Sequence, residues 1–157
     1  PKWHHRLLYE WCASIDSPVE PATYDDVLEV SPRLWPEVNL ARRCAPQLAS
    51  ALLGTAAYQE LLFPGGSMEM TLPVYEDAVI SRFYNDCLVA AVDSIVACLP
   101  DGRLLSVVEI GAGTGGTASS VLPRLQGVCL QYMFTDVSET FLNQAQRRFA
   151  ECRLHAL

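Results

Sequence analysis

The stretch LLSVVEIGAGTGGT, residues 104–117, decides the fold. Its first seven residues are mostly apolar and partly β-branched, which is typical of a strand buried on both faces of a parallel sheet. A glycine-rich turn, residues 111–116, follows directly, and residues 117–125 are predicted to form a helix. A strand, a glycine turn and a helix in this order provide the context that a nucleotide-binding βα turn requires.

The next residues repeat the alternation of strand and helix. The run VCLQYMF, residues 128–134, predicts a second buried strand. Ser138 is expected to cap the next helix, with Glu139 in the first turn, where the helix dipole favours a negative charge. Residues 152–157 are expected to begin a third strand. This alternation predicts an α/β fold.

The first third of the chain has a different character. Residues 1–36 are predicted to be linker-like, and the prolines in residues 13–36 predict an irregular segment with at most one helical turn. Residues 37–63 place apolar residues at helical spacing. Gly54 is expected to stop one helix there, and Thr55 to cap a short one after it.

Residues 75–99 predict the longest helix of the chain. Apolar pairs recur along it with a period near 3.6, which predicts a broad stripe that packs on a core. Tyr84 lies in this stripe and is expected to pack there rather than close over a ligand. The sequence Pro-Asp-Gly at 100–102 ends the helix and marks a predicted boundary between a helical part and the α/β part.

Asp136 completes the candidate site. It follows the second predicted strand, about 20 residues after the glycine turn, where a carboxylate accepts hydrogen bonds from two ribose hydroxyls. Glycines in the turn permit backbone angles that a β-carbon forbids, and they let a ligand approach the main chain. The pairing of turn and acid predicts a ligand that carries ribose, rather than a turn that only connects a strand to a helix.

Two ligand classes fit this pattern. Gly111, Gly113 and Gly116 satisfy G-x-G-x-x-G, the dinucleotide pattern. Glu109 with Gly111, Gly113 and Gly115 satisfies E-x-G-x-G-x-G, which is typical of enzymes that use S-adenosylmethionine (SAM). SAM is favoured, because an acid before the first glycine is able to bond the loop backbone or an amino group of the ligand. A pyrophosphate would gain nothing from that negative charge.

The composition of the chain bounds its size class and argues against several kinds of partner. The 157 residues predict one domain, or one domain with a small subdomain, and half of them are apolar, enough for a core. Lys plus Arg number 11 against 18 Asp plus Glu, so the net charge of −7 argues against nucleic acid as the main partner. The six cysteines form no CxxC pair, which disfavours structural zinc and favours buried thiols in a cytosolic protein. Neither a signal peptide nor a membrane span is expected.

The motifs together resemble one family, the C-methyltransferase domain of polyketide synthases. The resemblance rests on residues 107–117 (VVEIGAGTGGT), 121–123 (VLP), 132–138 (YMFTDVS), 61–67 (LLFPGGS) and 82–85 (RFYN). It implies a partial Rossmann-like sheet of the class I methyltransferase type, preceded by an N-terminal helical subdomain. Residues 37–100 would form this lid-like subdomain, and residues 101–157 the first part of the SAM-binding core.

The resemblance also implies a function. A domain of this kind transfers a methyl group from SAM to the α-carbon of a β-ketoacyl thioester on an acyl carrier protein. It works beside other synthase domains in the cytoplasm, without nucleic acid or membrane partners. The expected cofactor-binding residues are Glu109, Gly111, Ala112, Gly113, Thr114, Gly115, Asp136 and Val137.

One departure from the family matters. The family's catalytic His and Glu lie further downstream than residue 157, so no catalytic residue is expected in this chain. No metal ligand is expected either, because the sequence has no tight Cys/His cluster. Residues 1–157 alone are predicted to be inactive and to bind SAM weakly. The alternatives are a pseudo-methyltransferase that serves as a structural domain of a megasynthase and, third, an NAD(P)-dependent reductase.

Overall fold

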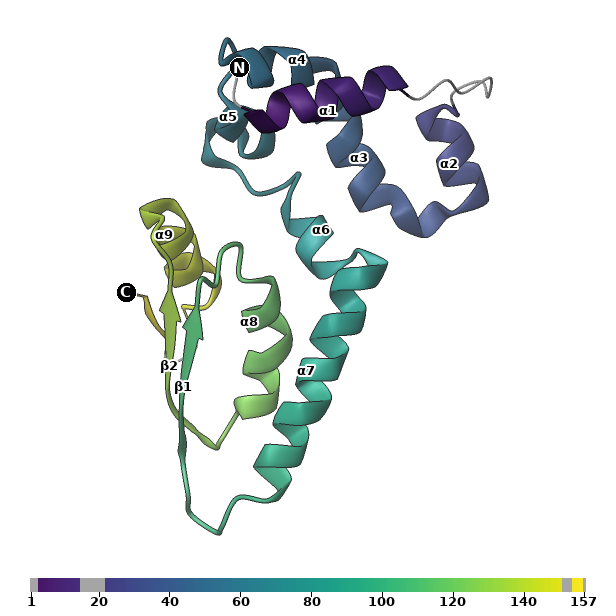
Figure 1. Cartoon of the computed structure of the whole chain (residues 1–157). Coiled ribbons are helices and arrows are strands. Elements are labelled where there is room, and N and C mark those ends of the chain that lie inside the picture. Colours follow the sequence, from purple (N-terminus) through teal and green to yellow (C-terminus); the bar gives the residue numbers. More distant parts are fainter. Residues whose placement is uncertain (1–2, 15–21, 151–153, 157) are drawn as a thin grey trace. The chain divides into compact units, whose positions relative to one another are not determined.

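The computed structural model describes residues 3–14, 22–150 and 154–156 (Figure 1). The chain forms two compact units, Pro1–Met70 and Thr71–Leu157. This division by compactness falls after residue 70, so the long helix predicted at residues 75–99 belongs to the same unit as the strands. The functional division predicted at residues 36 and 100 stays a prediction.

The first unit is helical. Its elements are α1 (Trp3–Ser14), α2 (Tyr24–Val30), η1 (Pro32–Leu34), α3 (Trp35–Cys44), η2 (Ala45–Gln47), α4 (Leu48–Leu53), α5 (Tyr58–Leu62) and η3 (Pro64–Gly66). Arg43 joins two of them, because its guanidinium on α3 donates to the carbonyl oxygens of Leu61 and Glu60 on α5, at 2.9 and 3.3 Å.

Two predictions for this unit are wrong. Helix α2 lies within the segment predicted to be irregular. Its cause is a capping box: the Thr23 hydroxyl accepts from the Asp26 N–H, and the Asp26 carboxylate accepts from the Thr23 N–H. Thr55 does not cap a helix, since α5 begins after Ala57; its hydroxyl donates to the Ser50 carbonyl oxygen instead. Gly54 does end α4, in the left-handed conformation.

The second unit contains the sheet. Its elements are α6 (Leu72–Glu76), α7 (Val79–Ala97), β1 (Leu105–Ile110), α8 (Gly116–Val121), η4 (Leu122–Leu125), β2 (Cys129–Thr135), α9 (Glu139–Arg148) and β3 (Leu154–Ala156). The described strands form a parallel sheet in the order β1-β2-β3. The predicted α/β fold of Rossmann-like type, with helices before the first strand, is confirmed.

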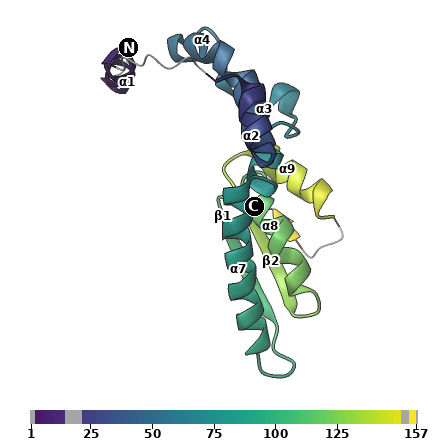
Figure 2. The same cartoon turned by 90° about the vertical axis from the view of Figure 1, so that its right-hand side faces the viewer.

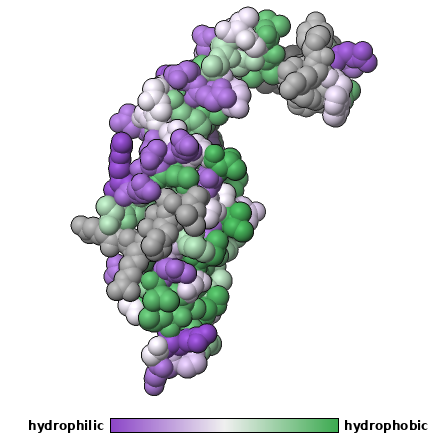
Figure 3. Space-filling model, turned by 90° about the vertical axis from the view of Figure 1, so that its left-hand side faces the viewer, coloured by the Kyte–Doolittle hydropathy of each residue, from purple (hydrophilic) through white to green (hydrophobic). Residues whose placement is uncertain are grey.

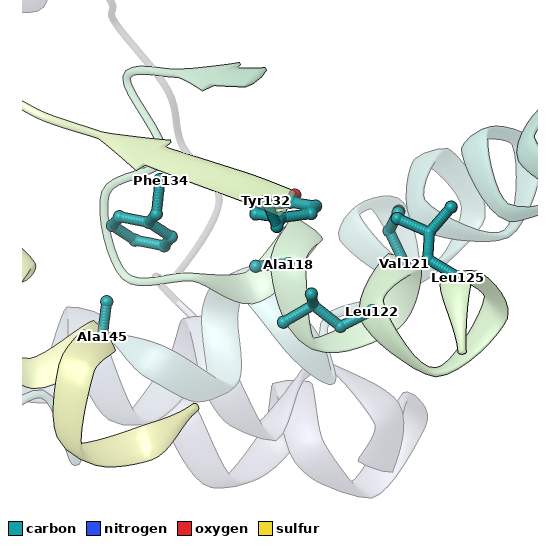
Figure 4. Packing of buried hydrophobic residues seen from close by; sticks show 7 residues of the cluster. All are labelled: Ala118, Val121, Leu122, Leu125, Tyr132, Phe134 and Ala145. Carbon is teal, nitrogen blue, oxygen red and sulfur yellow. The ribbon is translucent and has the colours of Figure 1, made fainter. Parts of the chain in front are cut away.

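The core of this unit lies between the sheet and its helices (Figure 4). Phe134 and Tyr132 project from the same side of β2, toward Ala145 of α9 and Ala118 of α8 respectively. Phe134 is fully buried. Burying one such side chain contributes roughly 1.5–3 kcal/mol, so this layer fixes the position of β2 and of the residues that follow it.

The opposite face of the sheet is open, although the apolar run of β1 is typical of a strand buried on both faces. Along β1, Leu105, Val107 and Glu109 are half-buried, whereas the residues between them are exposed, and Ile110 is 87% exposed. Figure 3 shows apolar side chains gathered on the side of the molecule away from α7. The described helices of this unit therefore leave one face of the sheet to solvent.

Helix α7 also differs from its prediction. It packs along α8 and η4 (Figures 1 and 2) through a narrow stripe that includes Val92 and Val96. The rest of its apolar surface is exposed, and Tyr84, expected in the core, is 66% exposed. The reason is that apolar residues surround most of this helix, while the described part of the unit covers only one side of it.

Candidate functional site

The glycine loop connects β1 to α8 and is fixed to the end of β2. The Ala112 N–H donates to the Thr135 carbonyl oxygen at 2.9 Å, and the Thr135 hydroxyl donates to the Glu109 carbonyl oxygen at 2.7 Å. Gly115 then occupies the N-cap position of α8. The loop therefore lies at the carboxyl edge of the parallel strands, where open α/β sheets bind their ligands.

Asp136 points at this loop, as the sequence predicts. One carboxylate oxygen (Oδ2) accepts from the Gly113 N–H at 2.9 Å, and the other (Oδ1) accepts from the Ser138 N–H at 2.8 Å. Ser138 is the N-cap residue of α9, as expected, but its side chain makes no capping hydrogen bond. Its N–H is instead bonded to the Asp136 carboxylate. A carboxylate has about four acceptor positions, and those left over suit hydroxyl donors.

The front of the loop is open. A β-carbon at Gly111 would meet nothing within 4 Å, and one at Gly113 would meet only the Gly111 carbonyl oxygen, at 3.9 Å. Gly113 has a φ of 57°, a conformation that suits glycine. The space in front of Gly111 and Gly113 is thus free of side chains, so a ligand is able to approach the main chain there.

The back of the loop is packed. A β-carbon at Gly116 would lie 2.9 Å from the Tyr75 carbonyl oxygen of α6, which is closer than real β-carbons come. One at Gly115 would lie 3.0 Å from the ring of Phe149. Thr114 between the two sides of the loop is only 7% exposed. The main chain of α6 and the ring of Phe149 therefore occupy this side of the loop and leave no room for a ligand.

Glu109 is half-buried beside Tyr132. The Tyr132 hydroxyl donates to the Glu109 carboxylate at 2.8 Å. Burial raises the pKa of Glu109, and the tyrosine bond opposes this shift only in part. Burial also raises the pKa of Tyr132, with the nearby carboxylate adding to the effect. No signal in the sequence marks Tyr132 as the partner of Glu109, and the expected contact of Glu109 with a cofactor amino group stays a prediction.

Three more residues complete the site: Val137, which the sequence predicts, and Arg148 and Glu76, which it does not. Val137 follows Asp136 and is fully exposed. Arg148 of α9 and Glu76 of α6 form an ion pair behind the loop, and Arg148 also donates to the Thr114 carbonyl oxygen at 3.3 Å. No local sequence signal marks this pair, because the fold brings together two helices that are distant in the chain.

Comparison with known proteins gives the class. The family described as "Methyltransferase domain" matches residues 108–157. Polyketide synthase ThaQ of Burkholderia thailandensis is 40% identical over 121 residues, which cover 73% of this chain and 6% of ThaQ. The family match therefore includes the glycine loop and Asp136. The chain spans only a small part of the length of ThaQ.

Solved structures agree with the sequence match. The carbon methyltransferase of CurJ superposes with a TM-score of 0.82 at 27% identity, over 98% of this chain and 46% of that structure. The methyltransferase (CMeT) domain of the citrinin polyketide synthase gives a TM-score of 0.83 at 26% identity, over 98% of this chain and 47% of that structure. The chain thus spans about half the length of the solved domains it matches.

The fold, the loop and these matches define a methyltransferase domain. More narrowly, the chain belongs to the methyltransferase domains of polyketide synthases, and carbon methyltransferases are its structural neighbours. The resemblance found in the motifs is confirmed.

Three further findings concern other classes of site. Within residues 3–14, 22–150 and 154–156, no group of three metal-ligating side chains comes together. Over the same ranges, the helices are too short or too polar to cross a membrane. Cys44, Cys87 and Cys98 carry free thiols; the last two are exposed, so the expectation that the cysteines are buried is wrong for them.

Proposed function

We propose that this chain supplies the cofactor-binding part of a C-methyltransferase domain and that the cofactor is S-adenosylmethionine. The proposed contacts are the loop backbone for the methionine part, the Asp136 carboxylate for the ribose hydroxyls and the Glu109 carboxylate for the amino group. The binding residues are Glu109, Gly111, Ala112, Gly113, Thr114, Gly115, Asp136 and Val137. When bound, SAM supplies an activated methyl group.

One observation carries this proposal: the Asp136 carboxylate is bonded to the Gly113 N–H beside an open loop surface. The carboxylate is half-buried and already oriented by two backbone donors, so it needs little rearrangement to accept a ribose hydroxyl. The membership in a methyltransferase family supports SAM over a nicotinamide dinucleotide.

The proposed methyl acceptor is the α-carbon of a β-ketoacyl chain held as a thioester on an acyl carrier protein. Support comes from relatives that are polyketide synthases and from neighbours named carbon methyltransferases. The other domains of such a synthase are the proposed partners, and the cytoplasm is the proposed location. The free thiols of Cys44, Cys87 and Cys98 are consistent with a reducing compartment.

We also propose that methyl transfer needs more of the domain than residues 1–157. The solved carbon methyltransferases are about twice as long as the matched part, and the open sheet face at Ile110 has room for further packing. The 157-residue chain is therefore expected to bind the cofactor weakly and to form no methylated product from a β-ketoacyl thioester. Measurable turnover by this chain would contradict that expectation.

Saturation-transfer NMR tests the cofactor, because it detects weak binding. With the 157-residue chain we expect signal transfer to the adenine and ribose protons of SAM, competed by S-adenosylhomocysteine. NADH at the same concentration is the matched comparison, and we expect no transfer to it. Transfer to NADH and not to SAM would overturn the proposal in favour of a reductase, and transfer to neither would overturn the ligand assignment.

A further inference from the structure

An ion pair lies directly behind the glycine loop. The Arg148 guanidinium of α9 is bonded to the Glu76 carboxylate of α6, and the side chains are only 30% and 23% exposed. The other terminal nitrogen of Arg148 (Nη1) donates to the Thr114 carbonyl oxygen at 3.3 Å. Arg148 thus connects two helices to the main chain of the loop itself.

Neighbouring groups restrain this pair. The Ser119 hydroxyl of α8 lies 2.8 Å from the same Glu76 oxygen and 2.7 Å from the Gly116 carbonyl oxygen. The guanidinium carbon of Arg148 lies 5.1 Å from the centre of the Phe149 ring, within range of a cation–π interaction. An arginine held on several sides loses little further freedom when it bonds a carbonyl oxygen, so the bond to Thr114 orients the loop efficiently.

Thr114 is the residue through which this orientation reaches the front of the loop. Its neighbours are Gly113, which donates to Asp136, and Gly115, whose N–H donates to the Ala112 carbonyl oxygen at 3.0 Å. Because Arg148 bonds the Thr114 carbonyl oxygen on the packed side of the loop, the peptide plane between Thr114 and Gly115 has a fixed orientation. Glycine-rich segments have the most conformational freedom to lose when a ligand binds, so prior fixing favours binding.

We propose that Arg148 and Glu76 are positioning residues, which hold the glycine loop in its cofactor-binding conformation from behind. They act through the Thr114 carbonyl, on the packed side of the loop. This inference rests on the proposed function, because the ligand whose binding they favour is SAM.

The test compares two arginine–carboxylate pairs in one unit. Arg148→Met removes the charge and keeps an apolar side chain against Phe149. The matched control is Arg124→Met, since Arg124 of η4 bonds Asp93 of α7 through two nitrogens at 2.7 Å each. Hydrogen exchange of the Gly115 amide reports loop order without ligand, and amide-shift titration with SAM reports the dissociation constant.

We expect Arg148→Met to raise the SAM dissociation constant about tenfold, the effect of losing one charge-assisted hydrogen bond. It should also speed exchange of the Gly115 amide, whereas Arg124→Met should change neither. Arg148→Lys, which keeps the charge without the forked geometry, should be intermediate. Glu76→Gln should act in the same direction, and its effect should not add to that of Arg148→Met.

Equal dissociation constants and equal Gly115 exchange in Arg148→Met and wild type would overturn the inference. If the Met variant does not fold, Arg148→Lys and Glu76→Gln give the same comparison. If wild type binds no SAM, the proposed cofactor is wrong, and Gly115 exchange alone then decides whether the pair orders the loop.

Discussion

The two sides of the glycine loop use the same residue type for different reasons. At the front, a β-carbon at Gly111 would meet nothing within 4 Å, and one at Gly113, which donates to Asp136, would meet only a carbonyl oxygen at 3.9 Å. At the back, Gly116 lets the loop approach the main chain of α6 so closely that a β-carbon would collide with it. One motif thus contains glycines that make room for a ligand and glycines that make room for the fold. Substitutions on the two sides should therefore separate binding from stability.

The largest effect is expected from the layer that supports the back of the loop. Phe134→Ala should lower the free energy of unfolding by about 3–5 kcal/mol, because Phe134 is fully buried and its truncation leaves a cavity. Hydrogen exchange of the β2 amides measures this in the second unit, since all three tryptophans lie in the first. Ile110→Ala, on the open face of the sheet, should change stability by less than about 0.5 kcal/mol. If Phe134→Ala and Ile110→Ala lowered the free energy of unfolding by similar amounts, the two faces of the sheet would not differ in burial as described.

Gly116→Val should come next. The new side chain would collide with the Tyr75 carbonyl oxygen, which cannot rotate away, so we expect a loss of about 3 kcal/mol in unfolding free energy. Gly111→Ala at the front is the matched variant, because its β-carbon meets open space and costs only the left-handed backbone, about 1 kcal/mol. Exchange of the β1 and β2 amides compares the two. A loss at Gly111 as large as that at Gly116 would contradict an open front.

Asp136→Ala should act mainly on binding. It removes the acceptor for two backbone N–H groups and for the ligand hydroxyls, so we expect SAM binding to weaken about 100-fold, with a smaller loss of stability. The dissociation constant is measured by amide-shift titration. Asp136→Asn keeps the shape and one acceptor oxygen and should weaken binding less. An Asp136→Ala protein that binds SAM like wild type would exclude the carboxylate from the site.

The smallest effect concerns the pH dependence of stability. Burial raises the pKa of Glu109 above its ordinary value of 4.5, so the folded protein binds a proton there that the unfolded chain has lost. The contribution of Glu109 is therefore most favourable at low pH and falls as pH rises from about 4.5 through the raised value. Glu109→Gln should remove this part of the dependence while keeping an acceptor for Tyr132. Exchange of the β2 amides, measured from pH 4 to 7 in wild type and in Glu109→Gln, reports this change in stability. If the stabilities of the two proteins depend on pH in the same way, the raised pKa of Glu109 is contradicted.

The sequence predicted the parts of the fold that local signals encode. The strand and loop around Gly111 and the acid after the second strand are linked by parallel strand geometry, so their meeting follows from spacing. Helix α2 escaped prediction because its capping box uses Asp26 where Glu or Gln is usual. The exposure of Tyr84 and the approach of Arg148 to Thr114 depend on which distant helices pack together, and spacing along the chain carries no such information.

Amide-shift mapping of the 157-residue chain with SAM tests the central claim most directly. We expect the largest shifts on the amides of Gly111, Gly113 and Asp136, and we expect them to be absent in the Asp136→Ala protein. Amides of the open sheet face, such as Val108 and Ile110, should stay in place. The claim would be contradicted if SAM did not shift the loop amides, or if the same shifts appeared in the Asp136→Ala protein.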